Sequence, residues 1–121
     1  MVSYVPNSGV NGLYRLKYRT DEWDVDFQKY LKELGKPVIL CGDMNVAYED
    51  IDVFDGRRKR NKAAGFTDVE RASFGKLLKA GFVDTYRHFH GQKIAYSYWN
   101  VRSAARAKGQ GWRLDYFVVS E

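Results

Sequence analysis

The sequence predicts one small domain of the α/β or α+β class, because segments with helical spacing alternate with segments of strand character along its 121 residues. Apolar residues recur at intervals of three, four and seven between residues 15 and 34, which is the pattern of an amphipathic helix. Residues 38–41 form a short, continuously apolar run, which is typical of a buried strand. Thr67 and Glu70 form a capping box, which predicts the start of a second helix.

In the first half of the chain, residues 3–5 are β-prone and end at Pro6, and a turn-rich loop follows. We expect the helix at residues 15–34 to carry Asp24 on its solvent-exposed face and to end at Gly35. The apolar strand comes next.

In the second half, residues 55–65 predict a basic loop, and the helix that starts at Thr67 ends before Gly81. Residues 82–86 predict a short extended piece. Residues 95–99 and 112–119 predict strands, and the segment between them is a second basic loop.

Composition favours a folded protein with an anionic partner. The chain is 45% apolar, and 20 Lys and Arg residues against 15 Asp and Glu give a formal net charge of +5. No apolar run approaches the roughly 18–20 residues of a membrane span, so no membrane association is expected. Cys41 is the only cysteine, which favours an intracellular, reducing location in the nucleus or cytoplasm.

Gly42-Asp43-Met44-Asn45 is the first candidate for chemistry, because it follows the buried strand at the edge where α/β folds collect ligands. Asp43 has the chemistry to accept a proton from water or to hold a metal, and Asn45 can donate to a phosphate oxygen. Gly42 would let the backbone approach a ligand closely. The alternative interpretation is a simple Asp-x-Asn turn, which these residue types favour equally.

Asp115 interrupts the last apolar strand, and a buried carboxylate there would need a His or Arg partner. A purely structural pairing with a nearby Arg is the alternative. His88 and His90 lack further ligands at metal-binding spacing, so we interpret them as surface residues.

The two basic loops, residues 57–62 and 102–113, predict contacts with a nucleic-acid backbone, because each has no interleaved acid. Tyr98 and Trp112 flank the second loop and suit stacking or an apolar pocket. A solvated charge run without a function is the alternative.

Taken in order, these segments resemble the exonuclease III-type apurinic/apyrimidinic endonucleases of the endonuclease/exonuclease/phosphatase superfamily. The Gly-Asp-x-Asn segment is common to the superfamily, whereas three blocks together are specific to the abasic-site branch. These blocks are Gly65-Phe66-Thr67, Tyr96-Ser97-Tyr98-Trp99 and Gly111-Trp112-Arg113-Leu114-Asp115-Tyr116.

The resemblance implies catalytic roles for four residues. Asp43 is similar to the carboxylate that activates the attacking water, and Asn45 to the amide bound to the scissile phosphate. Tyr4 resembles a phosphate-contacting tyrosine, and Asp115 resembles the aspartate that orients a catalytic histidine. The implied DNA-binding residues are Asn7, Arg15, Tyr98, Arg102, Arg106, Lys108, Trp112 and Leu114. Among these, Tyr98, Trp112 and Leu114 match an apolar pocket for a flipped-out abasic sugar.

The resemblance also implies a four-layer αββα sandwich. This chain is expected to supply its C-terminal half, truncated at both ends, as one mixed sheet with two helices on its outer face. Neither the family's metal-binding acids nor its Ser-Asp-His motif occurs in the sequence, so no metal ligand is expected among residues 1–121. The inner face of the sheet would expose Val5, Ile39 and Phe117 and offer a surface for association.

The implied function is Mg²⁺- or Mn²⁺-dependent cleavage of double-stranded DNA 5′ to abasic sites, with possible 3′–5′ exonuclease activity and an inactive isolated chain. Two departures bear on strand insertion. The loop after Asn7 lacks the arginine that some relatives insert, and Arg102 stands where some place an apolar wedge. The alternatives are a non-catalytic nucleic-acid-binding module and a superfamily phosphodiesterase acting on a phospholipid or inositol phosphate.

Overall fold

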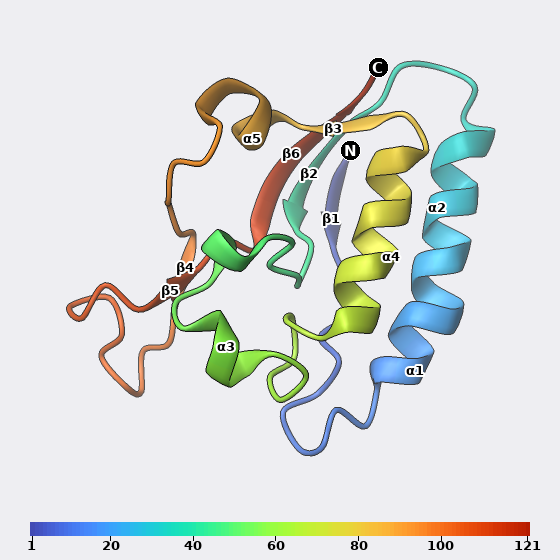
Figure 1. The fold of residues 1–121 in the computed structure, drawn as a ribbon. Helices are drawn as coiled ribbons and strands as arrows, with labels where there is room; N and C mark the ends of the chain where they lie inside the picture. Colours follow the sequence, from blue (N-terminus) through green and yellow to red (C-terminus); the bar gives the residue numbers. More distant parts are fainter.

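The computed structural model describes all 121 residues and contains a four-stranded mixed sheet (Figure 1). The spatial order of its strands is β1 (Val2–Tyr4), β2 (Ile39–Asp43), β6 (Asp115–Ser120) and β3 (Phe82–Asp84). Strand β1 runs parallel to β2, whereas β6 runs antiparallel to both of its neighbours, β2 and β3. The predicted mixed sheet is therefore confirmed.

The first predicted helix is a continuous helical run with an irregular centre. It comprises α1 (Leu16–Tyr18), a π-helical turn (Arg19–Trp23) and α2 (Asp24–Glu33). The wider turn shifts the residues that follow around the helix axis. Asp24 is consequently buried and accepts a hydrogen bond from the Ser73 hydroxyl at 2.7 Å, so its predicted solvent exposure was wrong.

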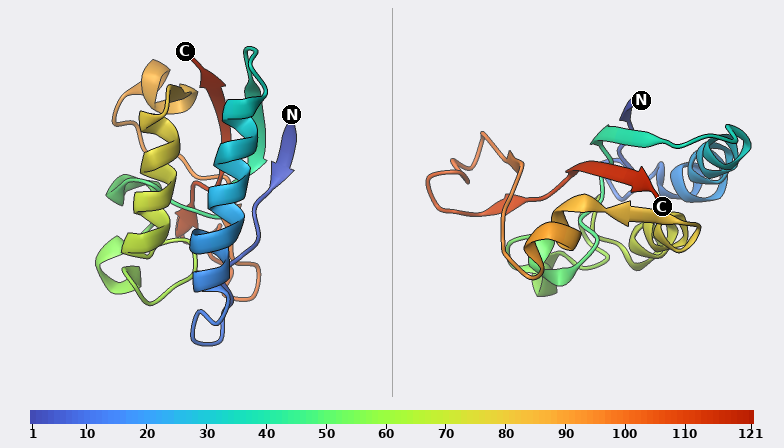
Figure 2. Two further views of the ribbon diagram at one scale, coloured as in Figure 1. Left: turned by 90° about the vertical axis from the view of Figure 1, so that its right-hand side faces the viewer. Right: turned by 90° about the horizontal axis from the view of Figure 1, so that it is seen from above.

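The second predicted helix is α4 (Asp68–Lys79), and its capping box forms as expected. The Glu70 backbone N–H donates to the Thr67 hydroxyl oxygen at 3.1 Å, and the Glu70 carboxylate accepts from the Thr67 N–H at 3.2 Å. Helices α2 and α4 lie side by side against one face of the sheet (Figure 2, left). The main core fills the space between the two layers with Leu31, Leu40, Phe74, Val118 and their neighbours.

The opposite face of the sheet has no covering layer. Ile39 and Phe117 are 62% and 63% exposed, as predicted for the inner face. The apolar run at residues 38–41 is therefore buried on one face only, which its unbroken pattern did not indicate. Val5 was wrongly placed on this face: it lies just after β1, is buried, and belongs to the core under the helices.

The remaining elements are short and lie outside the four-stranded sheet and its two long helices. They are a 3₁₀ turn (Asp50–Asp52), α3 (Gly56–Lys59), α5 (Thr85–His90), β4 (Tyr98–Trp99) and β5 (Gly111–Trp112). Three predictions are corrected here. The basic loop contains the short helix α3, residues 85–86 begin helix α5, and the strand at residues 95–99 is reduced to β4.

The predicted last strand is divided into β5 and β6 at Arg113 and Leu114. The division follows from Arg113, whose backbone N–H donates to the Asp52 carbonyl while its guanidinium turns inward toward two buried carboxylates. No helix of the structure has both the length and the apolar character needed to cross a membrane.

Candidate active site

Three of the four predicted catalytic residues lie in one row across the sheet. Tyr4 of β1 pairs with Asp43 of β2, and Asp43 pairs with Asp115 of β6. The row lies where β1 and β2 end, on the face of the sheet that the helices leave uncovered. A carboxylate pair and a phenol are thus brought together from residues far apart in the sequence.

The fourth residue, Asn45, turns the chain away from β2. Its backbone is left-handed, with φ of 48°, and its N–H donates to the Asp43 carboxylate at 2.8 Å. Its side-chain amide donates to the Val5 carbonyl at 2.5 Å, and the Asn7 amide reaches its oxygen at 3.4 Å. The tetrapeptide is therefore a tight Asp-x-Asn turn that also places both side chains at the sheet edge.

Gly42 serves the sheet in this structure. Its φ is +128°, and a Cβ atom at this position would lie 2.0 Å from the carbonyl oxygen of Ser3. The glycine is required by the close approach of β1, so the predicted ligand approach does not explain it.

The surroundings of the Asp43 carboxyl disfavour its negatively charged form. Burial raises its pKa above the ordinary value, and the negative charge of Asp115 raises it further. The Asn45 N–H and the positive charge of Arg19 act in the opposite direction. Such a carboxylate is a better proton acceptor than an ordinary surface aspartate.

Asp115 was predicted to be buried, and this was wrong. Its side chain is exposed, because it lies on the uncovered face of β6. It borders a second hollow, of about 300 Å³, together with Tyr96, Phe117 and His90. A partner for its carboxylate would therefore approach from that open face.

Seven predicted residues line one groove with a volume of about 480 Å³. Its lining combines the catalytic candidates with aromatic and aliphatic side chains. The seven residues are Tyr4, Asn7, Asp43, Asn45, Tyr98, Trp112 and Leu114. Lys62 and Asn100 also line the groove and were not singled out, although Lys62 belongs to the first basic run.

The other predicted DNA-binding residues lie outside the groove, on exposed loops. The Arg15 guanidinium lies 5.1 Å from the Tyr14 ring centre, and that of Arg106 lies 4.6 Å from the Trp99 ring centre. Arg102 and Lys108 are exposed on the loop that joins β4 and β5. In the first basic loop, by contrast, Arg58 and Arg60 form ion pairs with Asp55 and Asp68.

A buried ion cluster lies next to Trp112 and Leu114, two of the residues that line the groove. The Arg113 guanidinium donates to Asp52 at 2.8 Å and to Asp84 at 2.6 Å, directly between Trp112 and Leu114 in the sequence. Burial disfavours the charge on Asp52, but the hydrogen bonds from Arg113, the Glu49 N–H and Arg87, together with the charge of Arg113, outweigh that effect and lower its pKa. The sequence patterns did not single out this cluster.

The carboxylates of the chain do not fit a divalent-cation site by themselves. Asp43 and Asp115 are neighbours, but no group of three or more His, Cys, Asp or Glu side chains converges anywhere in the structure. Mg²⁺ and Ca²⁺ favour six or more oxygen ligands. His88 and His90 are exposed on α5, where a spacing of two residues points the side chains apart.

Residues 2–121 match the model of the Endonuclease/Exonuclease/phosphatase family. The chain is 52% identical to a DNA-(apurinic or apyrimidinic site) endonuclease of Dictyostelium discoideum, covering 98% of this chain and 34% of that protein. It is 49% identical to an exodeoxyribonuclease of Bacillus subtilis, covering 100% of this chain and 48% of that protein. The chain therefore spans about a third to a half of the length of these relatives.

The fold is similar to solved structures of the same kind. An AP endonuclease from Leishmania major matches with a TM-score of 0.88 at 35% identity, over 98% of this chain and 40% of that one. An AP endonuclease from Archaeoglobus fulgidus matches with a TM-score of 0.87 at 30% identity, over 98% of this chain and 47% of that one. The predicted α/β architecture and the predicted resemblance are both confirmed.

Proposed function

Because the chain belongs to the endonuclease/exonuclease/phosphatase family, we propose that it forms part of a DNA-repair endonuclease that cleaves the phosphodiester bond 5′ to abasic sites in double-stranded DNA. The observation that carries this proposal is the groove itself. It brings an acid, two amides and a phenol together with the apolar and aromatic side chains of Tyr98, Trp112 and Leu114.

The polar side chains of the groove supply the base and the hydrogen-bond donors that phosphodiester hydrolysis needs. Asp43 takes a proton from the attacking water, helped by its raised pKa. Asn45 uses one amide N–H on the Val5 carbonyl and keeps the second for a phosphate oxygen. Tyr4 and Asn7 add neutral donors that stabilise charge on the same oxygens.

The apolar side chains of the groove select the substrate. An abasic sugar without its base is small and lacks the polar edge of a nucleobase, so it suits a pocket of Tyr98, Trp112 and Leu114. An intact nucleotide would have to place a base in the same volume. Exposed cations on the neighbouring loops, Arg15, Arg102, Arg106 and Lys108, hold the DNA backbone.

The proposed enzyme uses Mg²⁺ or Mn²⁺, which would neutralise charge on the phosphate and lower the pKa of a bound water. The residues of this chain do not complete that site, so its ligands are assigned to other parts of the domain. Asp115 faces open space and would orient a histidine from there. A substrate of this kind places the protein in the nucleus or cytoplasm.

A non-catalytic nucleic-acid-binding module is the second candidate. It is favoured by the absence of a converging metal-ligand set, together with the free cations on the loop between β4 and β5. Incision of DNA separates the two candidates, because a binding module would retain affinity without turnover.

The test uses a chimera in which residues 1–121 replace the matched segment of the Bacillus subtilis exodeoxyribonuclease. Its substrates are a duplex with a single abasic site and the same duplex undamaged. We expect metal-dependent incision 5′ to the abasic site and much slower cleavage of the intact strand. A folded chimera that binds the duplex without incising it would favour the binding module, and equal cleavage of both duplexes would refute abasic-site selection.

A further inference from the structure

Asn45 turns the backbone inside the protein. Its φ of 48° is left-handed, a region that asparagine adopts more readily than most residues with a Cβ atom, and Asn45 is only 5% exposed. Its carbonyl oxygen and that of Met44 both turn away from the sheet ladder, toward the first helical run. These two carbonyls therefore need hydrogen-bond donors from within the fold.

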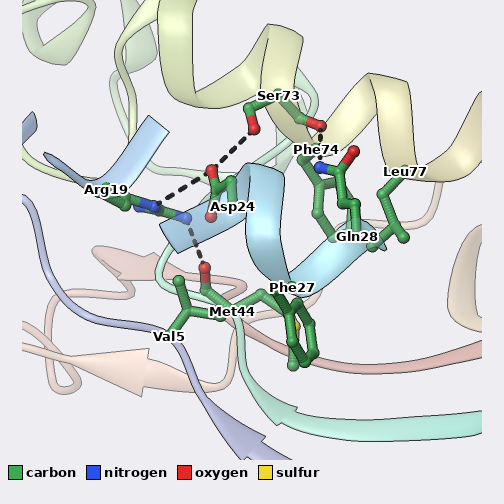
Figure 3. A pocket seen from close by; sticks show the side chains of 9 residues that line it. All are labelled: Val5, Arg19, Asp24, Phe27, Gln28, Met44, Ser73, Phe74 and Leu77. Atoms are coloured by element: carbon green, nitrogen blue, oxygen red, sulfur yellow. Dashed lines mark hydrogen bonds and ion pairs between the residues drawn. The ribbon is translucent and has the colours of Figure 1, made fainter. Parts of the chain in front are cut away.

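Arg19 supplies that support from the π-helical turn. It donates through Nη1 to the Asn45 carbonyl at 2.6 Å and through Nη2 to the Met44 carbonyl at 2.7 Å. The side chain is 2% exposed, and its remaining Nε lies 3.8 Å from Asp24 (Figure 3). The π-helical turn directs the Arg19 side chain into the protein, where its guanidinium reaches the turn after β2.

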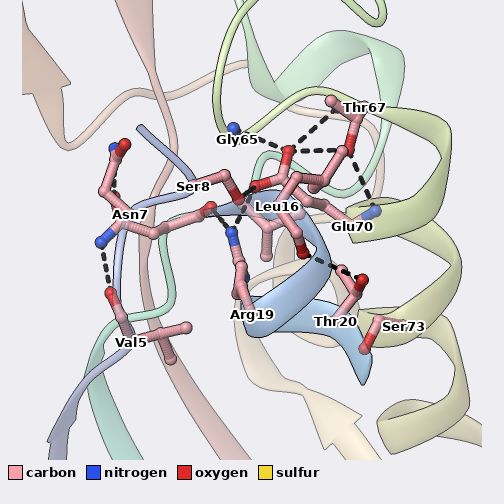
Figure 4. A network of polar contacts seen from close by, with 12 residues as sticks. Val5, Asn7, Ser8, Leu16, Arg19, Thr20, Gly65, Thr67, Glu70 and Ser73 are labelled. Carbon is pink, nitrogen blue, oxygen red and sulfur yellow. Dashed lines mark hydrogen bonds and ion pairs between the residues drawn. The ribbon is translucent and has the colours of Figure 1, made fainter. Parts of the chain in front are cut away.

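Glu70 fixes Arg19 and reaches two further loops (Figure 4). One carboxylate oxygen accepts from Arg19 Nη1 and from the Ser8 hydroxyl, both at 2.6 Å. The other oxygen accepts from the Gly65 N–H at 2.9 Å and the Thr67 hydroxyl at 2.8 Å. Glu70 is completely buried, so every one of these bonds lies away from water.

Each of the three loops joined in this way contributes residues to the groove. Ser8 follows Asn7, Gly65 follows Ala64, and Asn45 is itself a groove residue. A buried ion pair that only stabilised the helices would not need its donors on the carbonyls of Met44 and Asn45. The bonds are directed at the turn that carries Asn45 and Asp43.

We propose that Arg19 and Glu70 are positioning residues, which hold Asn45 at the angle that the groove requires and tie it to the loops of Asn7 and Ala64. Neither residue lies among those that line the groove, and both act through the backbone. The catalytic consequence of this assignment rests on the proposed function, whereas the structural link does not.

The first test measures the link in the 121-residue chain, without catalysis. Arg19→Lys keeps the positive charge but cannot donate to two carbonyls and a carboxylate in one plane. If Asn45 is released, its N–H withdraws from Asp43, and the Asp43 pKa should rise when followed by ¹³C NMR. The other charges that act on the Asp43 pKa are those of Asp115 and of residue 19, and Arg19→Lys changes the sign of neither.

Leu31→Ala is the matched control, because it removes buried packing under α2 but no hydrogen bond to the turn. We expect it to leave the Asp43 pKa and the Asn45 amide resonance unchanged. Ser8→Ala removes a single bond to Glu70 and should shift the Asp43 pKa in the same direction by less. An unchanged Asp43 pKa and Asn45 resonance in both Arg19→Lys and Ser8→Ala would overturn the assignment.

The second test measures kcat and KM in the chimera. Misplacing a reacting group by about 1 Å can cost about 10²-fold, so we expect Arg19→Lys to lower kcat by about 10- to 100-fold. KM should change little, because the loop cations that hold the DNA are untouched. A loss confined to KM would overturn the proposal. An inactive parent chimera would contradict the proposed function, while the NMR shifts would still support the link.

Discussion

The ionised Asp43 carboxylate lowers the stability of the folded protein, and its proposed role as a base accounts for this cost. Burial holds the pKa of its carboxyl above the ordinary value of 3.8, so the folded protein binds this proton more tightly than the unfolded chain does. The contribution of Asp43 to stability is therefore most favourable at low pH. It declines as the pH rises from the unfolded pKa through the raised folded pKa.

Asp43→Asn should therefore make the protein more stable at pH 7 and less active. The amide has nearly the same shape, can still accept from the Asn45 N–H, and carries no charge to desolvate. We expect a higher Tm at pH 7, with the difference from the unmodified protein shrinking toward pH 3.5. Incision by the chimera should fall by about 10²–10⁴-fold, the usual value of a positioned base. A lower Tm at pH 7 with full activity would contradict both roles.

Single residues show the limits of sequence reasoning most directly. The convergence of Tyr4, Asn7, Asp43 and Asn45 on one groove could be predicted, because all four lie in short motifs at strand ends. Arg19 was missed, because its partners Asn45 and Glu70 lie 26 and 51 residues away in the sequence. Only the tertiary fold brings such groups together.

At the scale of elements, the two basic loops differ in how free their charges are. Arg58 and Arg60 are engaged by Asp55 and Asp68, and Lys59 donates to the Phe54 carbonyl. The loop between β4 and β5 has three exposed cations without an acidic partner. We therefore expect this loop to contribute more to DNA binding than the first basic loop does.

DNA affinity should therefore depend on salt mainly through the loop between β4 and β5. Replacing Arg102, Arg106 and Lys108 together by Ala should reduce the slope of log K against log salt by about 0.9 for each phosphate that is no longer neutralised. The matched control replaces Arg57, Arg58 and Arg60 by Ala and should reduce the slope less. Titrations between about 50 and 200 mM salt measure both. A larger effect of the control set would assign DNA binding to α3 instead.

The break between β5 and β6 depends on Arg113. Removing its guanidinium would leave Asp52 and Asp84 as buried carboxylates without their main partner. Arg113→Met should lower the free energy of unfolding by about 3–5 kcal/mol in urea titrations. Arg60→Ala breaks an exposed ion pair with Asp68 and should leave that free energy nearly unchanged. Similar losses in the two variants would show that the cluster contributes no more than a surface pair.

Elements were predicted with mixed success, for physical reasons. The helices at residues 15–34 and from Thr67 onward were predicted because periodicity and capping are local signals. The π-helical turn, the burial of Asp24 and the break at Arg113 could not be predicted, since each depends on buried polar partners from other elements. Apolar pattern alone also could not reveal that β2 is covered on one face only.

At the scale of the whole molecule, the main feature is the sheet face that the helices leave uncovered. Val2, Ile39 and Phe117 are each more than 60% exposed there, beside the row of Tyr4, Asp43 and Asp115. An apolar surface of this kind favours association. We expect this face to pack against the remainder of the domain, which would also bring partners toward Asp115.

The central claim is that the chain carries one part of a divided catalytic site. The most direct measurement compares EDTA-sensitive incision of one abasic-site duplex by the isolated 121-residue chain and by the chimera, side by side. The account predicts incision by the chimera alone, because Asp43 and Asp115 do not complete a metal site and no histidine is paired with Asp115. EDTA-sensitive turnover by the isolated chain would contradict it.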